Sequence, residues 1–83
     1  MTPEDIRLVV LAELGRIAPE ADLAQLDPDA DLREAVDIDS VDFLGFLVAV
    51  NERLGVSIPE ADYRRITTLR SCTDYLDRKL HTT

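Results

Sequence analysis

The chain has 83 residues, enough for one small domain with a thin core, because a chain this short buries only about 60–65% of its unfolded surface. Its composition is 46% hydrophobic, which is too apolar for a disordered chain. Nine Lys and Arg residues stand against seventeen Asp and Glu, a net charge of −8. We therefore expect an acidic surface that repels nucleic acid and anionic membranes and attracts basic protein partners.

Cysteine usage and the N-terminal residues bear on the compartment. Cys72 is the only cysteine, which excludes an internal disulfide and a cysteine-rich metal site and suits a reducing environment. The first residues do not follow the pattern of a signal peptide, and no apolar run approaches the ~20 residues of a membrane span. We expect a cytoplasmic protein without a membrane span.

The first predicted element is a helix over residues 3–15. Thr2 is a suitable N-cap, Pro3 suits the first helical position, and two acids follow. Gly15 is the expected end. The apolar residues that repeat at helical spacing are Ile6, Val10, Leu14 and Ile17.

Residues 16–38 show no sustained period and contain Pro19 and Pro28. Apolar residues nevertheless recur, which is typical of a loop that packs on a core. We predict a long loop with a helical turn or two. Its expected core residues are Leu23, Leu26, Leu32 and Val36.

A second long helix is predicted from Asp39-Ser40 to Leu54, with Gly55 ending it. Its apolar residues cover most of the helix circumference, so we expect it to be the central helix, covered by its neighbours. These residues are Val41, Phe43, Leu44, Phe46, Leu47, Val48, Val50 and Leu54.

After this helix, residues 56–59 form a short extended link, because the residue before Pro59 avoids the helical conformation. A brief helix is predicted over residues 60–65, and Thr67-Thr68 is expected to cap a last helix with Leu69, Cys72, Leu76 and Leu80 on one face. The pattern predicts an all-α fold: a four-helix bundle of three longer helices and one short, with a long loop between the first two, as a single domain over residues 1–83.

The candidate site for chemical modification is Asp39-Ser40, where the long loop meets the second helix. The first turn of a helix has unpaired N–H groups and a positive dipole end, so a phosphodiester on Ser40 would be stabilised there. The alternative is that Ser40 is only a helix cap, since Asp-Ser is a common way to begin a helix.

The wider sequence resembles the acyl carrier protein family. Asp39-Ser40, followed by an apolar residue and Asp42, is similar to the family's Asp-Ser-Leu attachment site. Nearly the whole chain takes part in the resemblance. The further matching segments are Leu14-Gly15, Asp31-Leu32 and residues 55–59, 65–69 and 74–76.

The resemblance implies a four-helix acyl carrier rather than an enzyme. Ser40, with Asp39 completing the motif, would receive a phosphopantetheine arm from coenzyme A through a phosphopantetheinyl transferase. The arm's thiol would hold acyl intermediates as thioesters in fatty acid, polyketide or related biosynthesis.

The resemblance also implies further partners: an acyl- or aminoacyl-loading ligase or transferase, and synthase enzymes with basic docking patches. We expect a monomer. The implied partner-binding face consists of Asp37, Asp39, Val41, Asp42, Val48 and Glu52.

The sequence departs from the family pattern at several positions. Asp37 replaces a usual glycine, Val41 replaces the usual leucine, and Gly45 and Asn51 occupy positions that are often acidic. These changes suggest a specialised carrier with its own partners. An aminoacyl or peptidyl carrier remains an alternative, although Asp37-Ile38 does not fit the two glycines usual there. A non-catalytic helical interaction module, with Ser40 only as a cap, is the other alternative.

No metal site is expected. Asp27, Asp29 and Asp31 alternate as at the start of a calcium loop, but Leu32 stands where that loop needs glycine and Ile38 where it needs a closing acid.

Catalysis is also not expected. Cys72 is interpreted as a buried apolar residue. His81 is the only histidine and lies at the C-terminus, so a Ser–His arrangement lacks its base. Phe43 and Phe46 are interpreted as core residues rather than as the lining of a cargo pocket.

Overall fold

The computed structural model describes residues 1–81, and the part of the chain it describes is all-α with no β-strand. The predicted bundle of three longer helices and one short is confirmed: the short helix over residues 60–65 is a 3₁₀ helix, and the long loop contains two short helical segments, as predicted. The elements are α1 (Pro3–Ile17), η1 (Leu23–Gln25), α2 (Leu32–Ala35), α3 (Ser40–Leu54), η2 (Glu60–Arg65) and α4 (Leu69–His81), where η denotes a 3₁₀ helix.

Helix α1 begins as predicted and ends later than predicted. Thr2 and Asp5 form a capping box, in which each side chain accepts a hydrogen bond from the other's backbone N–H, at 3.2 and 3.1 Å. The predicted end at Gly15 is wrong, because the helix continues to Ile17. Gly15 lies inside the helix, and a Cβ there would be at an ordinary contact distance of 3.5 Å from Leu23 Cδ1.

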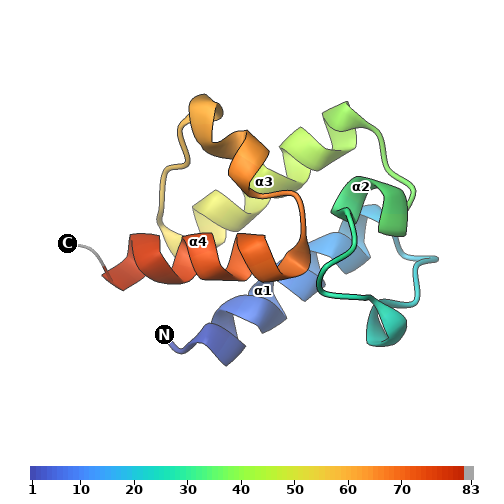
Figure 1. The fold of residues 1–83 in the computed structure, drawn as a ribbon, viewed down its shortest axis with the longest axis horizontal. Coiled ribbons are helices and arrows are strands. Elements are labelled where there is room, and N and C mark those ends of the chain that lie inside the picture. Colours follow the sequence, from blue (N-terminus) through green and yellow to red (C-terminus); the bar gives the residue numbers. More distant parts are fainter. Residues whose placement is uncertain (82–83) are drawn as a thin grey trace.

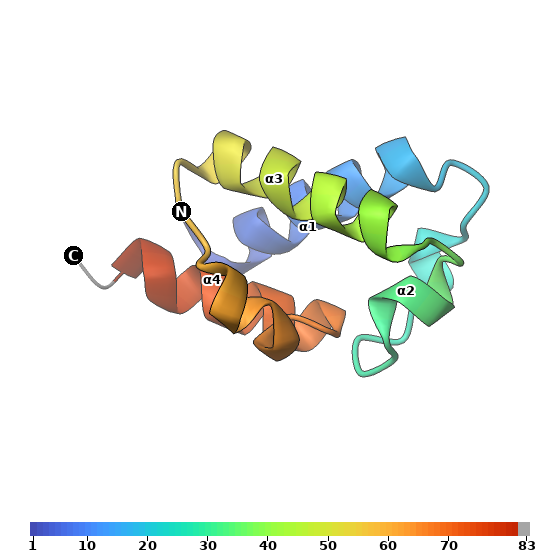
Figure 2. The ribbon, with the colours of Figure 1, turned by 90° about the horizontal axis from the view of Figure 1, so that it is seen from above.

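Helix α1 packs against both α3 and α4, and α4 also contacts η2 (Figures 1 and 2). The chain between α1 and α3 wraps one end of the molecule, where α2 lies, and the N-terminus lies at the other end. The prediction that the helix from residue 39 to 54 is the central one is therefore wrong. The helix with a long neighbour on two sides is α1.

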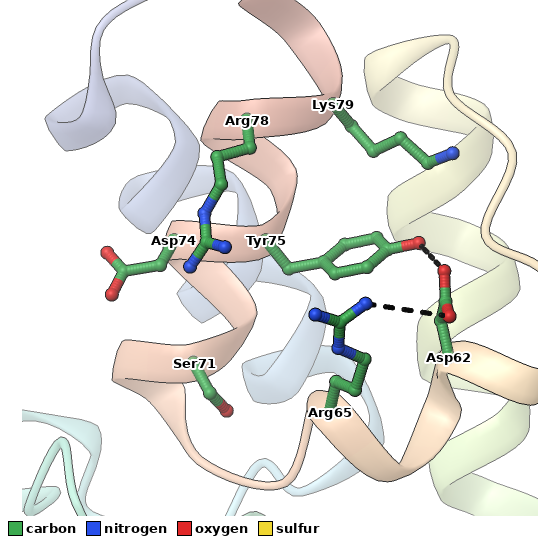
Figure 3. A pocket seen from close by; sticks show the side chains of 7 residues that line it. All are labelled: Asp62, Arg65, Ser71, Asp74, Tyr75, Arg78 and Lys79. Atoms are coloured by element: carbon green, nitrogen blue, oxygen red, sulfur yellow. Dashed lines mark hydrogen bonds and ion pairs between the residues drawn. The ribbon is translucent and has the colours of Figure 1, made fainter. Parts of the chain in front are cut away.

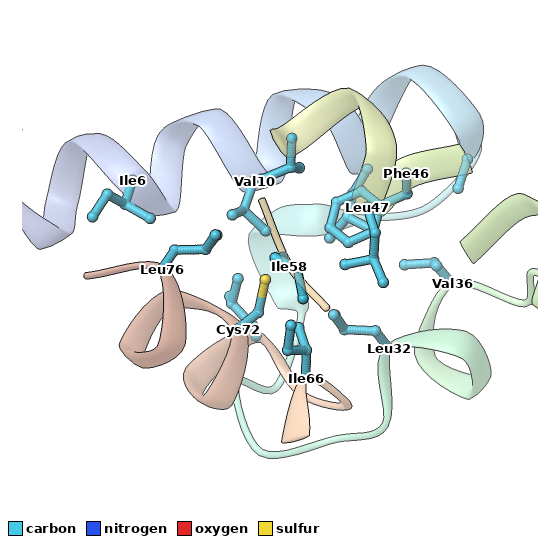
Figure 4. Close-up of a cluster of buried hydrophobic side chains, with 14 residues drawn as sticks. Ile6, Val10, Leu32, Val36, Phe46, Leu47, Ile58, Ile66, Cys72 and Leu76 are labelled. Carbon is cyan, nitrogen blue, oxygen red and sulfur yellow. The ribbon is translucent and has the colours of Figure 1, made fainter. Parts of the chain in front are cut away.

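The core lies between the three long helices and is closed at one end by the loop (Figure 4). Leu32 and Val36 are buried, and Leu23 and Leu26 pack against the core from its edge, so the predicted role of the loop residues is confirmed. The buried apolar residues are Ile6, Val10, Leu14, Ala18, Leu32, Val36, Phe46, Leu47, Val50, Ile58, Ile66, Leu69, Cys72 and Leu76.

Helix α3 is not covered all round. Val41 is 75% exposed, and Leu44 and Val48 are each 45% exposed. These residues are spaced by three and four positions, so they share one face of the helix. The core takes the other face, from which Phe46, Leu47 and Val50 are buried. The apolar circumference thus serves two surfaces, a buried one and an exposed one.

Glu13 is the one buried charged residue among those described, at 3% exposure. Its carboxylate accepts a hydrogen bond from Arg53 of α3 at 3.1 Å and lies 3.5 Å from Arg16 of α1. A buried carboxylate is unfavourable without such partners, so the pair fixes α1 against α3. The apolar periodicity of α1 gave no sign of this residue.

Candidate functional site

Ser40 is the first residue of α3, and its side chain is exposed. Asp39, not Ser40, caps the helix: its Oδ1 accepts the Asp42 N–H at 2.8 Å, and its carbonyl accepts the Phe43 N–H at 3.0 Å. Among residues 1–81, no side chain or backbone group hydrogen-bonds the Ser40 hydroxyl. The alternative in which Ser40 is only a helix cap is therefore wrong.

The helix end beside this hydroxyl is the positive end of the α3 dipole. Helix α3 spans 15 residues, and the N–H groups of its first turn point out of the helix without intrahelical partners. Only the Asp42 N–H is taken by the cap, which leaves those of Ser40 and Val41. A phosphodiester on Ser40 would meet these groups and the positive dipole end.

Asp37 has the one positive φ, 53°, among the described residues other than glycine. It follows α2 at the position where a Schellman motif requires the left-handed conformation, and the Ile38 N–H donates to the Arg33 carbonyl at 3.0 Å as that motif does. Glycine adopts this conformation without strain, whereas aspartate tolerates it less well. The left-handed turn at Asp37 leads the chain into Asp39-Ser40, and glycine is the residue that this backbone conformation would suit best.

Replacing Asp37 with glycine is expected to raise the free energy of unfolding by up to about 1 kcal/mol, because it relieves the left-handed aspartate. The measurement is the midpoint of chemical denaturation. Asp37→Val should lower the midpoint, since a β-branched residue tolerates positive φ least. A glycine variant less stable than the wild type would contradict this account of the turn.

A surface cleft of about 460 Å³ opens beside Ser40. Helix α3 supplies an apolar wall that includes Phe43 and Leu44, and the Tyr63 ring comes from η2. Sequence reasoning missed this cleft, because its walls come from separate elements, α2, α3 and η2, that only the tertiary fold brings together. Its lining residues are Asp31, Arg33, Ser40, Val41, Phe43, Leu44, Glu60, Tyr63, Arg64 and Thr67.

The two phenylalanines have different positions. Phe46 is fully buried, which confirms its interpretation as a core residue. Phe43 is half-buried: it packs against the core, its ring centroid lies 5.8 Å from that of Phe46, and it also lines the cleft. Phe43 therefore belongs both to the edge of the core and to the cleft wall, whereas the sequence interpretation gave it only the core role.

The residues predicted to bind partners are all exposed: Asp37, Asp39, Val41, Asp42, Val48 and Glu52. The structure brings Val41 and Val48 onto one face with Leu44, and we call these three residues the α3 stripe. Leu44 was not among the residues predicted to bind partners, although its spacing from Val41 and Val48 places it on the same helix face. A Cβ at Gly45 would meet no atom within 4 Å, so the surface here is open and smooth.

A second hollow of about 460 Å³ lies on η2 and α4 and shares no lining residue with the Ser40 cleft (Figure 3). The Tyr75 hydroxyl donates to Asp62 at 2.5 Å, and Arg65 lies 3.9 Å from the same carboxylate. Burial, together with this hydrogen bond, raises the pKa of Tyr75 to about 12. The phenol therefore stays neutral at physiological pH. The polar groups of Asp62, Arg65 and Tyr75 in this hollow contact one another.

The described residues hold no group of three or more potential metal ligands. The three alternating aspartates have other contacts: Asp29 binds Arg70 at 2.7 and 3.2 Å, Asp31 caps α2, and Asp27 accepts the Asp29 N–H. The hydrogen bond from Arg70 also holds the pKa of Asp29 below its ordinary value. His81, in the last turn of α4, contacts Asp77. None of the helices described has the length and apolarity to cross a membrane.

Cys72 is buried in α4, and burial raises the pKa of its thiol to about 12. Because the thiolate is the reactive form and the thiol is buried, the folded protein should react with a thiol reagent much more slowly than the unfolded chain near neutral pH. Timed alkylation with and without denaturant measures this ratio. Equal rates in both conditions would contradict the burial of Cys72.

Comparison with known proteins agrees with this geometry. Residues 4–76 match the family described as the phosphopantetheine attachment site. The acyl carrier protein of Micrococcus luteus is 26% identical over 77 residues, covering 93% of this chain and 95% of that protein. The acyl carrier protein of Thermosynechococcus vestitus is 26% identical over 81 residues, covering 93% of this chain and 89% of that protein. The chain belongs to the acyl carrier protein family, whose members are carriers with phosphopantetheine as cofactor and not catalysts.

Proposed function

We propose that Ser40 carries the phosphopantetheine arm. The observation that supports this most is the exposed, unpartnered hydroxyl at the first position of α3, inside the segment that matches the family. In the reaction, Ser40 Oγ bonds to the pantetheine-side phosphorus of coenzyme A. The phosphoanhydride bond breaks, 3′,5′-adenosine diphosphate leaves, and a base of the transferase takes the hydroxyl proton.

The carrier then holds acyl intermediates as thioesters on the arm's thiol, in fatty acid, polyketide or related biosynthesis. The apolar wall of the cleft beside Ser40 supports an acyl cargo, since it offers Phe43 and Leu44 to a hydrocarbon chain. The buried Cys72 would not compete for acyl groups. We place this activity in a single cytoplasmic domain, residues 1–83, that acts as a monomer.

The experiment is incubation of the purified protein with coenzyme A and a broad-specificity phosphopantetheinyl transferase. Intact-mass spectrometry should show the gain of one phosphopantetheine group. Loading with an acyl group should then add the mass of that acyl group, and hydroxylamine should remove it as expected for a thioester. The absence of any gain in the first step would contradict the proposal and favour a helical interaction module.

Partner enzymes would bind around the α3 stripe, whose exposed apolar residues adjoin the acidic start of the helix. The partner-binding set predicted from sequence is retained here with Leu44 added. Exposed apolar area supplies contact, and surrounding carboxylates speed encounter with basic patches.

Asp42→Lys is expected to slow transfer to and from partner enzymes by about threefold to tenfold at low salt, because it reverses a charge where basic patches dock. The rates of phosphopantetheinyl transfer and acyl loading measure the effect, which should shrink as salt rises. Asp74→Lys, an equal charge change at an exposed position on α4, is the control. If both variants behave alike, net charge rather than this face governs the rates.

A further inference from the structure

Two arginines differ from the others in having no side-chain partner among the residues that the structure describes. The chain has eight arginines. Within residues 1–81, no carboxylate, ring or hydrogen-bond acceptor engages the guanidinium of Arg33 or Arg64. Five of the remaining six form ion pairs with carboxylates: Arg7, Arg16, Arg53, Arg65 and Arg70.

Both unpaired arginines line the same cleft, the one that contains Ser40. Arg33 comes from α2 and Arg64 from η2, so the fold brings them together across about 30 residues of sequence. Asp31 also lines the cleft, but its Oδ1 already accepts the backbone N–H groups of Arg33 and Glu34. The cleft thus holds two guanidinium groups that remain available to a ligand.

The two unpaired arginines lie in a strongly acidic environment. Residues 1–59 contain four Lys and Arg against thirteen Asp and Glu. A phosphodiester on Ser40 would add a negative charge beside Asp39 and Asp42, where like charges repel it. Guanidinium groups match phosphate and carboxylate oxygens with two parallel hydrogen bonds, so they are suited to offset that repulsion.

We infer that Arg33 and Arg64 form an anion-binding pair in the Ser40 cleft, which receives a negatively charged oxygen group of the arm or of its cargo. The inference rests on the proposed attachment at Ser40. Its two sources share one chemistry: the phosphodiester that joins the arm to Ser40, and a carboxylate on an acyl cargo. The phosphodiester is favoured, because Ser40 itself lines the cleft.

This pair acts as a positioning device. When the two arginines bind the phosphodiester, the first atoms of the arm lie along the cleft wall formed by Phe43 and Leu44. Without this contact, the arm would extend freely from the helix end. The arm's orientation would then depend on α2 and η2, the two short elements that flank the start of α3.

The test follows the arginine Nε–H resonances by NMR in four forms: unmodified protein, protein with the arm, and protein loaded with succinyl or with butyryl groups. If the phosphodiester is bound, the Arg33 and Arg64 signals shift when the arm is added and stay there after loading. If a cargo carboxylate is bound, the signals shift with succinyl and not with butyryl. The Arg7 signal, from an exposed pair on α1, should stay constant throughout.

Variants give an independent measurement, the ³¹P resonance of the arm. The double variant Arg33→Gln and Arg64→Gln should shift this resonance from its wild-type position, whereas Arg7→Gln should not. Arginine signals that stay constant in all four forms, although mass spectrometry shows the arm in place, would overturn the anion-binding pair and leave the carrier function intact. Failure to attach the arm at all would overturn both.

Discussion

Ser40→Ala is expected to abolish attachment of phosphopantetheine, leaving the protein at its unmodified mass after incubation with coenzyme A and transferase. The alanine variant has no oxygen to bond to phosphorus. Its fold should be unchanged, because Asp39 rather than Ser40 caps α3 and the Ser40 side chain is exposed. Loss of the arm should therefore occur with a wild-type helical circular-dichroism spectrum and an unfolding free energy within about 0.5 kcal/mol of the wild type.

Ser57→Ala is the matched control, since Ser57 is also exposed but lies in the link between α3 and η2. This variant should be modified as fast as the wild type. Modification of Ser40→Ala at a normal rate would show that another side chain accepts the arm. A slowed Ser57→Ala would show that the transferase reads the far end of α3.

Phe46→Ala is expected to reduce the free energy of unfolding by about 3–5 kcal/mol, because it leaves a cavity where a fully buried ring packs in the core. Small domains of this kind are stable by only about 5–15 kcal/mol, so the variant should be partly unfolded or unfold at much lower denaturant concentration. Urea denaturation followed by circular dichroism measures the change.

Phe43→Ala is the comparison, since its half-buried ring leaves part of its surface in the cleft. A clearly smaller loss of stability is expected there. An equal loss for both variants would contradict the different burial of the two rings, and with it the division of α3 into a buried face and an exposed face.

The helices of this protein could be predicted from sequence because their signals are local. The capping box at Thr2, the left-handed Gly55 after α3 and the Thr68–Ser71 cap of α4 each involve residues within a few positions of one another. The boundary of α1 was missed because Gly15 lies inside the helix, which continues to Ile17, and does not terminate it. A glycine inside a pattern does not by itself mark a helix end.

The error about α3 has a different cause. Apolar residues all round a helix predict burial, but the sequence does not say whether the second face meets this chain or another molecule. Val41 at 75% exposure shows that the fold leaves it uncovered. Only the packing of α1, α3 and α4 together decides which face remains.

The site was predictable in part. Asp39-Ser40 could be placed at a helix start from local pattern, and the family resemblance added the expectation of a phosphopantetheine arm. The cleft beside Ser40 was out of reach, because Arg33, Tyr63 and Arg64 approach α3 through tertiary contacts that no local period encodes. The strained backbone of Asp37 was likewise visible only once its dihedral angles were known.

The most direct measurement is to locate the arm by tandem mass spectrometry of peptides from the modified wild-type protein. The chain has three serines, Ser40, Ser57 and Ser71, which lie far enough apart to be separated by proteolysis. Fragment ions should assign the whole added mass to Ser40, with the other two unmodified. An arm found on any other residue would contradict the account of a free hydroxyl at the positive end of α3 as the point of attachment.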